Sequence, residues 1–236
     1  MRLLCNATVT AAACIALCMA PVLAHAEGQM RSHILSHPEV IAETLRLEAR
    51  DKAAEAKERA AILKQRRDEI FNDPSAPVGG NPQGDTTLVE FFDYNCLYCR
   101  NAAAILEALE REDKGVRLVF KEFPTLGPGS MFAARAALAS QKQGQYRAFH
   151  KAMMAYRDVI TEASVLEVAA QAGLDVDTLM KDIKNPAIDD AIRRDLALAG
   201  ALHLEEPPVF IAGRQIRAGL IDLDALKQLI AEARKQ

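Results

Sequence analysis

The stretch FFDYNCLYCR, residues 91–100, places two cysteines two residues apart. An apolar run precedes the pair, and a segment with the residue pattern of a helix follows it. Such a pair can be a redox site, half of a zinc site or two ordinary buried thiols. The rest of the sequence bears on which of these three it is.

The first 26 residues have the pattern of a secretory signal peptide. Arg2 supplies a positive charge, the run from Thr8 to Leu23 is nearly all apolar, and Ala24-His25-Ala26 is a small-x-small cleavage sequence. The apolar run is short for a membrane span, which argues against a retained anchor. We therefore expect cleavage after Ala26, export, and no membrane span in the mature chain.

Removal of that segment changes the cysteine count. Cys5, Cys14 and Cys18 leave with it, so Cys96 and Cys99 remain. One pair at this spacing builds no disulfide framework, which leaves redox chemistry or a metal as its purpose. Loss of Arg2 changes the formal net charge from −3 to −4, and a chain of this charge offers no electrostatic footprint for nucleic acid.

Residues 38–71 have the composition of a long helix. Ser36 and Glu39 have the spacing of a helix N-cap, and neither Gly nor Pro interrupts the segment after its first residue. The pattern predicts one helix of about 50 Å or two helices with a bend. Ile41 and Leu45 begin a narrow apolar seam that buries little by itself. We expect a homo-oligomer through this segment; the alternative is an arm that folds back on the rest of the chain.

A Pro/Gly-rich break, NDPSAPVGGNPQGD over residues 72–85, separates this helical segment from the rest. We therefore divide the chain into a signal peptide over residues 1–26, an N-terminal helical stalk over residues 27–72 and a globular domain over residues 73–236. A short edge strand is expected near Val78, within the break.

The order of elements in residues 73–236 predicts an α/β protein. A strand, a helix and a second strand are expected over residues 87–93, 96–112 and 116–120, as in a right-handed parallel crossover. The helices that follow are expected over residues 131–141, 146–157, 164–172, 176–183 and 187–202. Two strands, 209–212 and 215–218, and a helix, 221–233, end the chain. These are the two halves of a thioredoxin-like fold with a helical insertion at about residues 126–204.

Cys96 stands where a strand gives way to a helix. Free N–H groups and a partial positive charge at a helix N-terminus favour a thiolate. We therefore expect Cys96 to have a lowered pKa and to act as a nucleophile. Cys99 lies one turn further along the same face, where it can close a disulfide with Cys96 or resolve a mixed disulfide.

A metal site is the alternative use of these thiols. A structural zinc ion usually has four ligands, so the pair would need two more. The mature chain offers His33, His37, His150 and His203. Thiolates also bind Cu(I). Two inert thiols fit less well, because Asp93, Asn95 and Arg100 make the neighbourhood polar.

Three segments resemble the DsbA-type branch of the thioredoxin superfamily. LVEFFDYNCLYC, residues 88–99, is similar to its active-site strand and helix start; LVFKEFPTLGPGS, residues 118–130, to the segment that follows; and PPVFIAGRQIRAG, residues 207–219, to its cis-proline loop and hairpin. HPEVIAETLRLE, residues 37–48, resembles the helical leader of ScsC-like members. The resemblance implies a periplasmic thiol–disulfide oxidoreductase, an oxidase or a disulfide isomerase, that acts on protein substrates and needs no cofactor. It also implies a membrane redox partner that resets the cysteines. The alternative function is a periplasmic copper or zinc binding protein.

The resemblance assigns roles to particular residues. Cys96 becomes the attacking cysteine, Cys99 the resolving one, and Pro208 the cis-proline beside them. Leu97 and Tyr98, inside the motif, become substrate contacts. They replace the Pro-His of the strongest oxidases, so we predict a less oxidising pair.

Pro207 and Glu90 complete the expected site. Pro207 precedes the cis-proline and has no N–H, so one backbone hydrogen bond to a substrate should be missing. Glu90 matches the family's buried acid. A carboxylate inside an apolar strand should have a raised pKa and can move protons as the thiols change state. Alternatively Glu90 pairs with Lys121, which we also expect as an accessory residue.

Overall fold

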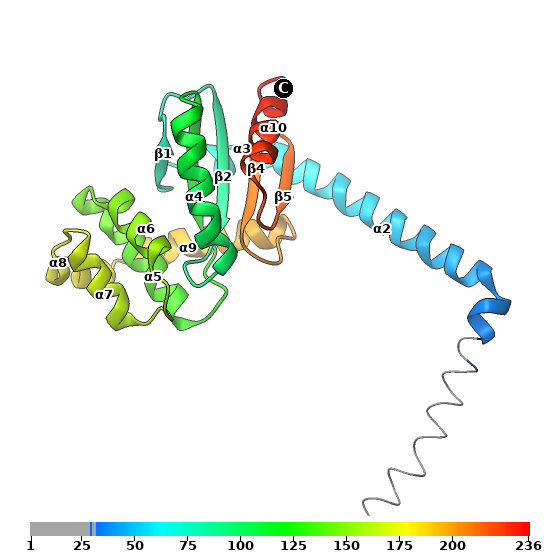
Figure 1. The fold of residues 1–236 in the computed structure, drawn as a ribbon, viewed down its shortest axis with the longest axis horizontal. Helices are drawn as coiled ribbons and strands as arrows, with labels where there is room; N and C mark the ends of the chain where they lie inside the picture. Colours follow the sequence, from blue (N-terminus) through cyan, green and yellow to red (C-terminus); the bar gives the residue numbers. More distant parts are fainter. Residues whose placement is uncertain (1–28, 30–31) are drawn as a thin grey trace, which may run out of the picture. The chain divides into compact units, whose positions relative to one another are not determined.

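The computed structural model describes residue 29 and residues 32–236 (Figure 1). The predicted signal peptide and its three cysteines lie outside these residues. The chain divides into two compact units between Lys57 and Glu58, and each unit is described by itself. Among the described residues, no helix combines the length and the apolar character that crossing a membrane requires.

Helix α2 (Pro38–Gln65) begins in the first unit, with Pro38 as its first residue. The expected N-cap role of Ser36 is wrong. Residues 32–36 are already helical, and the Ser36 hydroxyl donates to the carbonyl oxygens of Ser32 and His33 at 2.8 and 3.0 Å. Ser36 therefore ends the preceding helical turn, and His37 stands between it and the first residue of α2.

The helical segment is broken near its end. Helix α2 stops at Gln65, and the short helix α3 (Arg67–Phe71) follows after Arg66, so the alternative with two helices is confirmed. Ile70 and Phe71 are buried in a core cluster of the second unit. The end of the predicted stalk therefore belongs to the globular unit, and the boundary expected at residues 72–73 stays a prediction.

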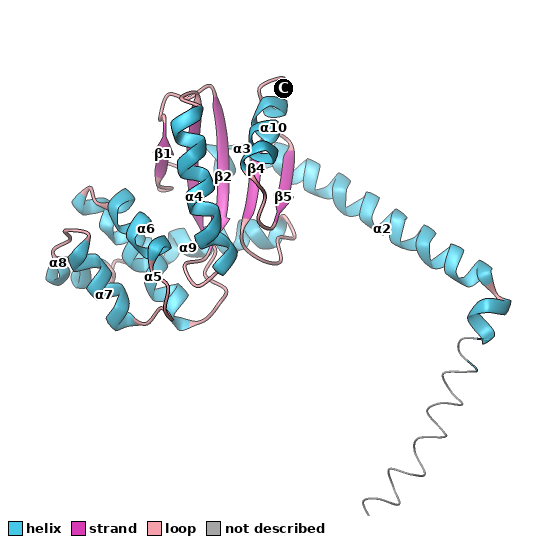
Figure 2. Cartoon of the chain, in the orientation of Figure 1, coloured by secondary structure: helices cyan, strands magenta, loops and turns pink. Residues whose placement is uncertain are grey.

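A five-stranded mixed sheet forms the centre of the second unit (Figure 2). Its strands are β1 (Val78–Gly80), β2 (Thr86–Phe92), β3 (Val116–Glu122), β4 (Val209–Ala212) and β5 (Gln215–Ala218), in the order β1-β3-β2-β4-β5. Strands β2 and β3 are parallel, and helix α4 (Leu97–Glu112) connects them. The other neighbouring strands are antiparallel. The expected crossover, edge strand and C-terminal hairpin are all confirmed.

Alternation along the strands divides the core into two layers. Leu88 and Phe92 of β2 share one core cluster with residues of α4 and of α10 (Leu223–Ala233). Val89 and Phe91 point to the other face and share a second cluster with residues of α3 and of α9 (Pro186–Ala201). Strand β2 is therefore buried on both faces, as its continuous apolar sequence predicts.

The helical insertion lies between β3 and β4 in the chain. Its elements are α5 (Pro128–Ser140), a 3₁₀ turn (Gln141–Gln143), α6 (Tyr146–Ala155), α7 (Glu162–Gln171), α8 (Val176–Asp182) and α9. Thr161, Asp175 and Asn185 cap the last three helices through their side chains. The insertion is attached beside the carboxyl end of β2, and it contributes helix α6 to one side of α4.

Candidate active site

Cys96 is the N-cap residue of α4, in an extended conformation with φ −75° and ψ 115°. Its sulfur accepts a hydrogen bond from the backbone N–H of Cys99 at 3.2 Å. The Cys96 thiol also donates to the carbonyl oxygen of Pro207 at 3.3 Å. Both thiols are free and buried. The strand-to-helix junction therefore places the sulfur where the sequence predicts it.

The two thiols have opposite proton affinities. A hydrogen bond from the Cys99 side chain is the largest cause that lowers the pKa of Cys96 to about 7. The backbone N–H groups of Cys99 and Tyr98 also lower the pKa of Cys96, whereas burial and the charge of Asp93 raise it. Burial raises the pKa of the Cys99 thiol far above its ordinary value. One sulfur is thus a nucleophile near neutral pH, while the other keeps its proton.

Pro208 follows Pro207, whose carbonyl oxygen accepts the hydrogen bond from the Cys96 thiol. The peptide bond between Pro207 and Pro208 is cis, which confirms the geometry expected for this loop. The Pro208 carbonyl oxygen accepts a hydrogen bond from the N–H of Gly219 at 2.8 Å, which ties the loop to the end of the β5 hairpin. The structure therefore brings Cys96, Cys99 and the proline loop together.

Glu90 is buried in β2, six residues before Cys96. Neither carboxylate oxygen finds a hydrogen-bond partner among the described residues. Burial raises the pKa of Glu90 to about 8, and the charge of Cys96 acts in the same direction. The charge of Glu90 in turn raises the pKa of Cys99. Glu90 is therefore electrostatically coupled to both thiols.

Lys121 does not pair with Glu90, so that alternative is wrong. Glu90 lies beside Phe120 in the parallel register, and successive strand residues point to opposite faces. Lys121 thus lies on the other side of the sheet, where its Nζ contacts Asp73 at 2.7 Å and Asp195 at 2.9 Å. Its accessory role at the thiols stays a prediction.

A second buried acid, Glu122, was not predicted from the sequence. It follows Phe120 by two residues on β3 and therefore faces the same side of the sheet as Glu90. Burial raises its pKa well above the ordinary value, and the charges of Asp195, Asp93 and Glu90 add to that shift. The two-residue spacing from Phe120, which places Glu122 on the same buried face if the strand continues past residue 120, was the signal that could have identified it.

His150 of α6 lies on the same side of the sheet. Its Nδ1 is 3.0 Å from the Tyr94 hydroxyl and 3.5 Å from the Tyr146 hydroxyl, and its ring packs edge-on against Phe92. Burial lowers the pKa of His150 to about 3, so the ring is neutral at physiological pH. No sequence signal links α6 to β2, because only tertiary packing brings them together.

Asp93 and Asn95 hold the loops around the cysteines. Asp93 accepts the N–H groups of Asn95, Thr125 and Leu126 at 2.7, 2.9 and 2.9 Å. Asn95 accepts the N–H of Ile160 at 3.2 Å and donates to Ser130 at 3.1 Å. Asp93 and Asn95 thus hold the loops around the cysteines through hydrogen bonds to their backbone and to Ser130.

The histidines considered as zinc ligands lie in separate places. His33 and His37 are in the first unit, His203 lies 3.6 Å from Glu58, and His150 is enclosed by tyrosines. Among residues 29 and 32–236, no three His, Cys, Asp or Glu side chains are grouped to hold a metal ion. The described part of the chain therefore presents two thiols without further ligands beside them.

Comparison with known proteins identifies the family. The model of the DsbA-like thioredoxin domain matches residues 87–231, which include the cysteines and the proline loop. The chain belongs to the DsbA-like thioredoxin family. As a member of this family of thiol–disulfide oxidoreductases, it carries the Cys96–Cys99 pair at the family's redox site.

Three solved structures share the fold of this chain over nearly their whole length. A thioredoxin-like oxidoreductase from Silicibacter pomeroyi is 46% identical, with a TM-score of 0.71 over 72% of this chain and 98% of that one. A periplasmic thioredoxin-like protein from Salmonella enterica is 30% identical, with a TM-score of 0.66 over 72% and 96%. The catalytic domain of Proteus mirabilis ScsC is 25% identical, with a TM-score of 0.68 over 75% and 99%.

Curated relatives of the DsbA-like chain include much longer proteins. A Na(+)/H(+) antiporter, NhaA of Herminiimonas arsenicoxydans, is 28% identical over 160 residues. The match spans 67% of this chain but about a quarter of the antiporter's length. The similarity therefore concerns one segment of that protein, and its transport activity is not transferred to this chain.

Proposed function

We propose that this protein exchanges disulfides with exported proteins in the periplasm, through Cys96 and Cys99. The observation that carries the proposal is the low-pKa thiol of Cys96, buried between Cys99 and the carbonyl oxygen of Pro207. A thiolate is the reactive form in disulfide exchange, and its neighbour must be able to displace it. The pair meets both conditions.

The exchange proceeds in two balanced steps. The Cys96 thiolate attacks a substrate disulfide, forms a mixed disulfide and releases one substrate thiolate. Cys99 then gives up its proton, which the first released substrate thiolate takes up, and attacks the Cys96 sulfur; this closes the Cys96–Cys99 disulfide and releases the second thiolate. The substrate disulfide is reduced and the pair is oxidised. The reverse sequence oxidises a dithiol. Attack by a different substrate thiolate on the substrate sulfur of the mixed disulfide forms a new substrate disulfide, releases the Cys96 thiolate and so isomerises the substrate.

Glu90 accompanies these steps as a proton carrier. The charge of the Cys96 thiolate helps to keep Glu90 protonated, because it raises the carboxyl pKa. When the pair becomes a disulfide, that charge disappears and the pKa of Glu90 falls. Glu90 can then release a proton, and it takes one up again when the pair is reduced.

The surface around Cys96 supports a polypeptide substrate. Large apolar side chains that are exposed in residues 58–236 are Leu97, Tyr98, Leu126, Val159 and Leu220. All five belong to the motif or to loops tied to the site: Leu126 donates its N–H to Asp93, residue 159 precedes Ile160, and residue 220 follows Gly219. An exposed apolar surface around a reactive thiol fits an unfolded chain better than a small polar thiol.

The helical segment supports a role in assembly. Val40, Ile41, Leu45 and Leu47 of α2 are exposed in the first unit. Exposed apolar side chains along one helix favour burial against a second copy of the helix. We propose that the chain forms a homo-oligomer through residues 38–57. Such an assembly would place several active sites in one particle and favour disulfide isomerisation. Light scattering of the mature chain with and without these residues tests this; a monomer in both cases would leave simple oxidase or reductase action.

Turnover of a protein disulfide tests the main proposal. The reduced protein should accelerate insulin reduction in the presence of dithiothreitol, and a redox-buffered sample should reactivate scrambled ribonuclease. Cys96→Ser should abolish both activities, whereas Cys99→Ser should accumulate a mixed disulfide that gel electrophoresis detects. Equal rates for the wild type and Cys96→Ser would refute the proposal. Thiol trapping in periplasmic extracts then distinguishes a resting oxidant from a resting reductant.

A further inference from the structure

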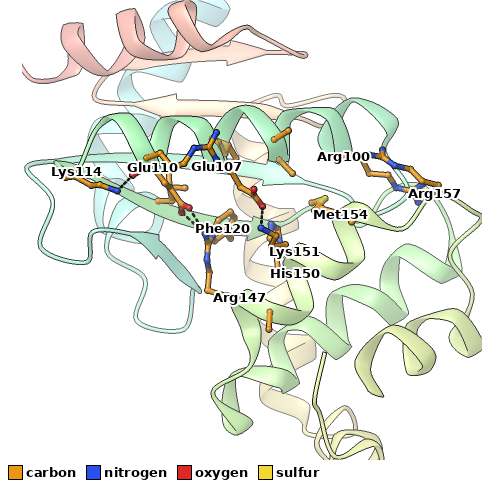
Figure 3. A pocket seen from close by; sticks show the side chains of 17 residues that line it. Arg100, Glu107, Glu110, Lys114, Phe120, Arg147, His150, Lys151, Met154 and Arg157 are labelled. Carbon is orange, nitrogen blue, oxygen red and sulfur yellow. Dashed lines mark hydrogen bonds and ion pairs between the residues drawn. The ribbon is translucent and has the colours of Figure 1, made fainter. Parts of the chain in front are cut away.

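A basic groove lies between α4 and α6, on the side of the active-site helix formed by the insertion (Figure 3). Its volume is about 730 Å³. The basic side chains that line it are Arg100, Arg111, Lys114, Arg147, Lys151 and Arg157. Glu107 and Glu110 are the acidic ones. The groove is thus strongly positive in a chain whose formal net charge is −3.

Two of the basic side chains are already neutralised across the groove. Lys151 contacts Glu107 at 3.0 Å, and Arg147 contacts Glu110 at 2.7 Å, so both pairs join α6 to α4. Among the described residues, Arg111, Lys114 and Arg157 are exposed and have no carboxylate partner; the Lys114 Nζ donates only to the carbonyl oxygen of Glu110.

The end of the groove nearest the cysteines holds two cations close together. Arg100 donates to the carbonyl oxygens of Tyr94 and Asp158 at 2.7 and 3.3 Å, which fixes its guanidinium. Burial lowers the pKa of Arg100, and the charge of Arg157 lowers it further. Figure 3 shows both side chains at the same end of the groove. Two like charges held together are stabilised when an anion binds between them.

The groove has the length of a peptide segment. Arg100 and Arg111 lie near the two ends of α4, and eleven residues of helix span about 16 Å; Lys114 follows in the turn after α4. About five extended residues cover that length of helix. Ala103, Leu106 and Met154 form an apolar floor between the charges. A single small anion would occupy only one end, whereas an acidic peptide can reach both.

We infer that this groove binds an acidic segment of the substrate polypeptide while the substrate's cysteine reacts at Cys96. The inference rests on the proposed function, because it assigns a sequence preference to the same exchange reaction. Arg157 receives the carboxylates nearest the reacting cysteine, and Lys114 and Arg111 receive those further along the segment. A substrate with glutamates at that distance reacts faster than its amide counterpart.

The test uses two peptides that differ only in charge. Each contains one cysteine beside a run of glutamates or glutamines, and both orders of cysteine and run are made. The single-turnover rate at which each peptide attacks the Cys96–Cys99 disulfide to form a mixed disulfide with Cys96 and release the Cys99 thiolate is divided by its rate with bis(2-hydroxyethyl) disulfide, a small neutral disulfide, which corrects for thiol reactivity. We expect the glutamate peptide to react about fivefold faster in one order at low salt, with the preference lost at high salt.

Variants locate the preference. The double variant Arg157→Gln/Lys114→Gln should reduce the rate ratio toward one, whereas Lys235→Gln, an exposed cation outside the groove, should keep the wild-type ratio. Arg100 is left intact because its bonds hold the active-site loop. Equal corrected rates for the two peptides in both orders, or an unchanged ratio in the double variant, would overturn the inference.

Measurement of peptide binding tests the groove independently of the disulfide exchange. If neither peptide forms a mixed disulfide with the protein, the proposed function fails, and fluorescence anisotropy with labelled, cysteine-free peptides still tests the groove. Tighter binding of the glutamate peptide than of the glutamine peptide, reduced in the double variant, would support the groove alone. If the peptides react with the protein at equal corrected rates, the exchange activity stands and the groove has no role in it.

Discussion

The thiol of Cys96 donates a hydrogen bond to the carbonyl oxygen of Pro207 at 3.3 Å. A thiolate cannot make this bond, but it keeps the one that it accepts from the N–H of Cys99, at 3.2 Å. Ionisation therefore frees the Pro207 carbonyl. Because Pro207 has no N–H, this oxygen is its only backbone hydrogen-bonding group. The activated form of the site thus offers a substrate one acceptor beside the reactive sulfur.

The pKa of Cys96 should depend on a proton donor at position 99. The Cys99 side chain is the largest cause that lowers the Cys96 pKa to about 7. Cys99→Ser keeps a hydroxyl donor, whereas Cys99→Ala removes the donor and leaves only the backbone amides. We expect Cys96 to titrate about one pH unit higher in the alanine variant than in the serine variant. The ultraviolet absorbance of the thiolate measures both values, and equal midpoints would assign the shift to the backbone alone.

Replacement of Glu90 should change stability in a pH-dependent way. Burial raises the Glu90 pKa from 4.5 to about 8, so the folded state holds a proton that the unfolded state releases above pH 4.5. The wild type is therefore destabilised progressively as the pH rises from about 4.5 to about 8. Glu90→Gln cannot ionise and escapes this loss, which amounts to about 5 kcal/mol at most.

Urea unfolding of the reduced protein measures this difference. The free energy of unfolding of Glu90→Gln should match that of the wild type most closely near pH 4 and should exceed it most near pH 8. Glu69→Gln, a substitution of an exposed acid, is the control and should show no such increase. A constant difference across this pH range would mean that Glu90 ionises normally in the folded protein.

The sequence predicted the fold well because its signals are local. The apolar strand before Cys96, the hairpin turn at Gly213 and the capped helices of the insertion each depend on neighbouring residues. The break at Arg66 could only be stated as an alternative. It depends on the burial of Ile70 and Phe71 in the second core cluster, and burial of that kind is a tertiary property.

The residues of the sequence motifs were predicted, whereas the residues that only tertiary packing brings to the site were missed. Cys96, Cys99 and the cis-proline loop follow from spacing and resemblance. The Glu90–Lys121 alternative failed because it ignored the parallel register, which places Phe120 beside Glu90. His150 and the basic groove depend on where α6 packs, and no pattern in the sequence joins α6 to α4.

Removal of Lys121 should destabilise the fold. Its ammonium is buried between Asp73 and Asp195, which joins the segment after α3 to the insertion. Lys121→Met leaves two carboxylates facing each other without a cation, at a cost of roughly 3 kcal/mol or more. The double variant Lys121→Met/Asp195→Asn removes one of these charges and should recover part of the loss in urea unfolding.

The same variant tests the accessory role of Lys121. Since Lys121 lies on the opposite face of the sheet from Glu90, we expect folded Lys121→Met to keep the wild-type Cys96 pKa. A shifted thiolate titration in the folded variant would instead show that the charge acts through the sheet. A double variant as unstable as Lys121→Met would show that the remaining carboxylates do not repel each other.

The two residues inside the motif should set the reduction potential. Leu97 and Tyr98 are 61% and 60% exposed, and neither can place a positive charge beside the Cys96 thiolate. The reduced form is therefore stabilised less than in a motif that contains histidine, and we expect a potential clearly below the value of about −120 mV found for DsbA. Tyr98→His adds a cation when protonated, which should lower the Cys96 pKa and raise the potential by about 30 mV for each pH unit of that shift. Tyr98→Gln is the neutral control and should move the potential less. Equilibration with glutathione buffers measures all three proteins, and a wild-type value near −120 mV would show that this site stabilises its thiolate without a histidine in the motif.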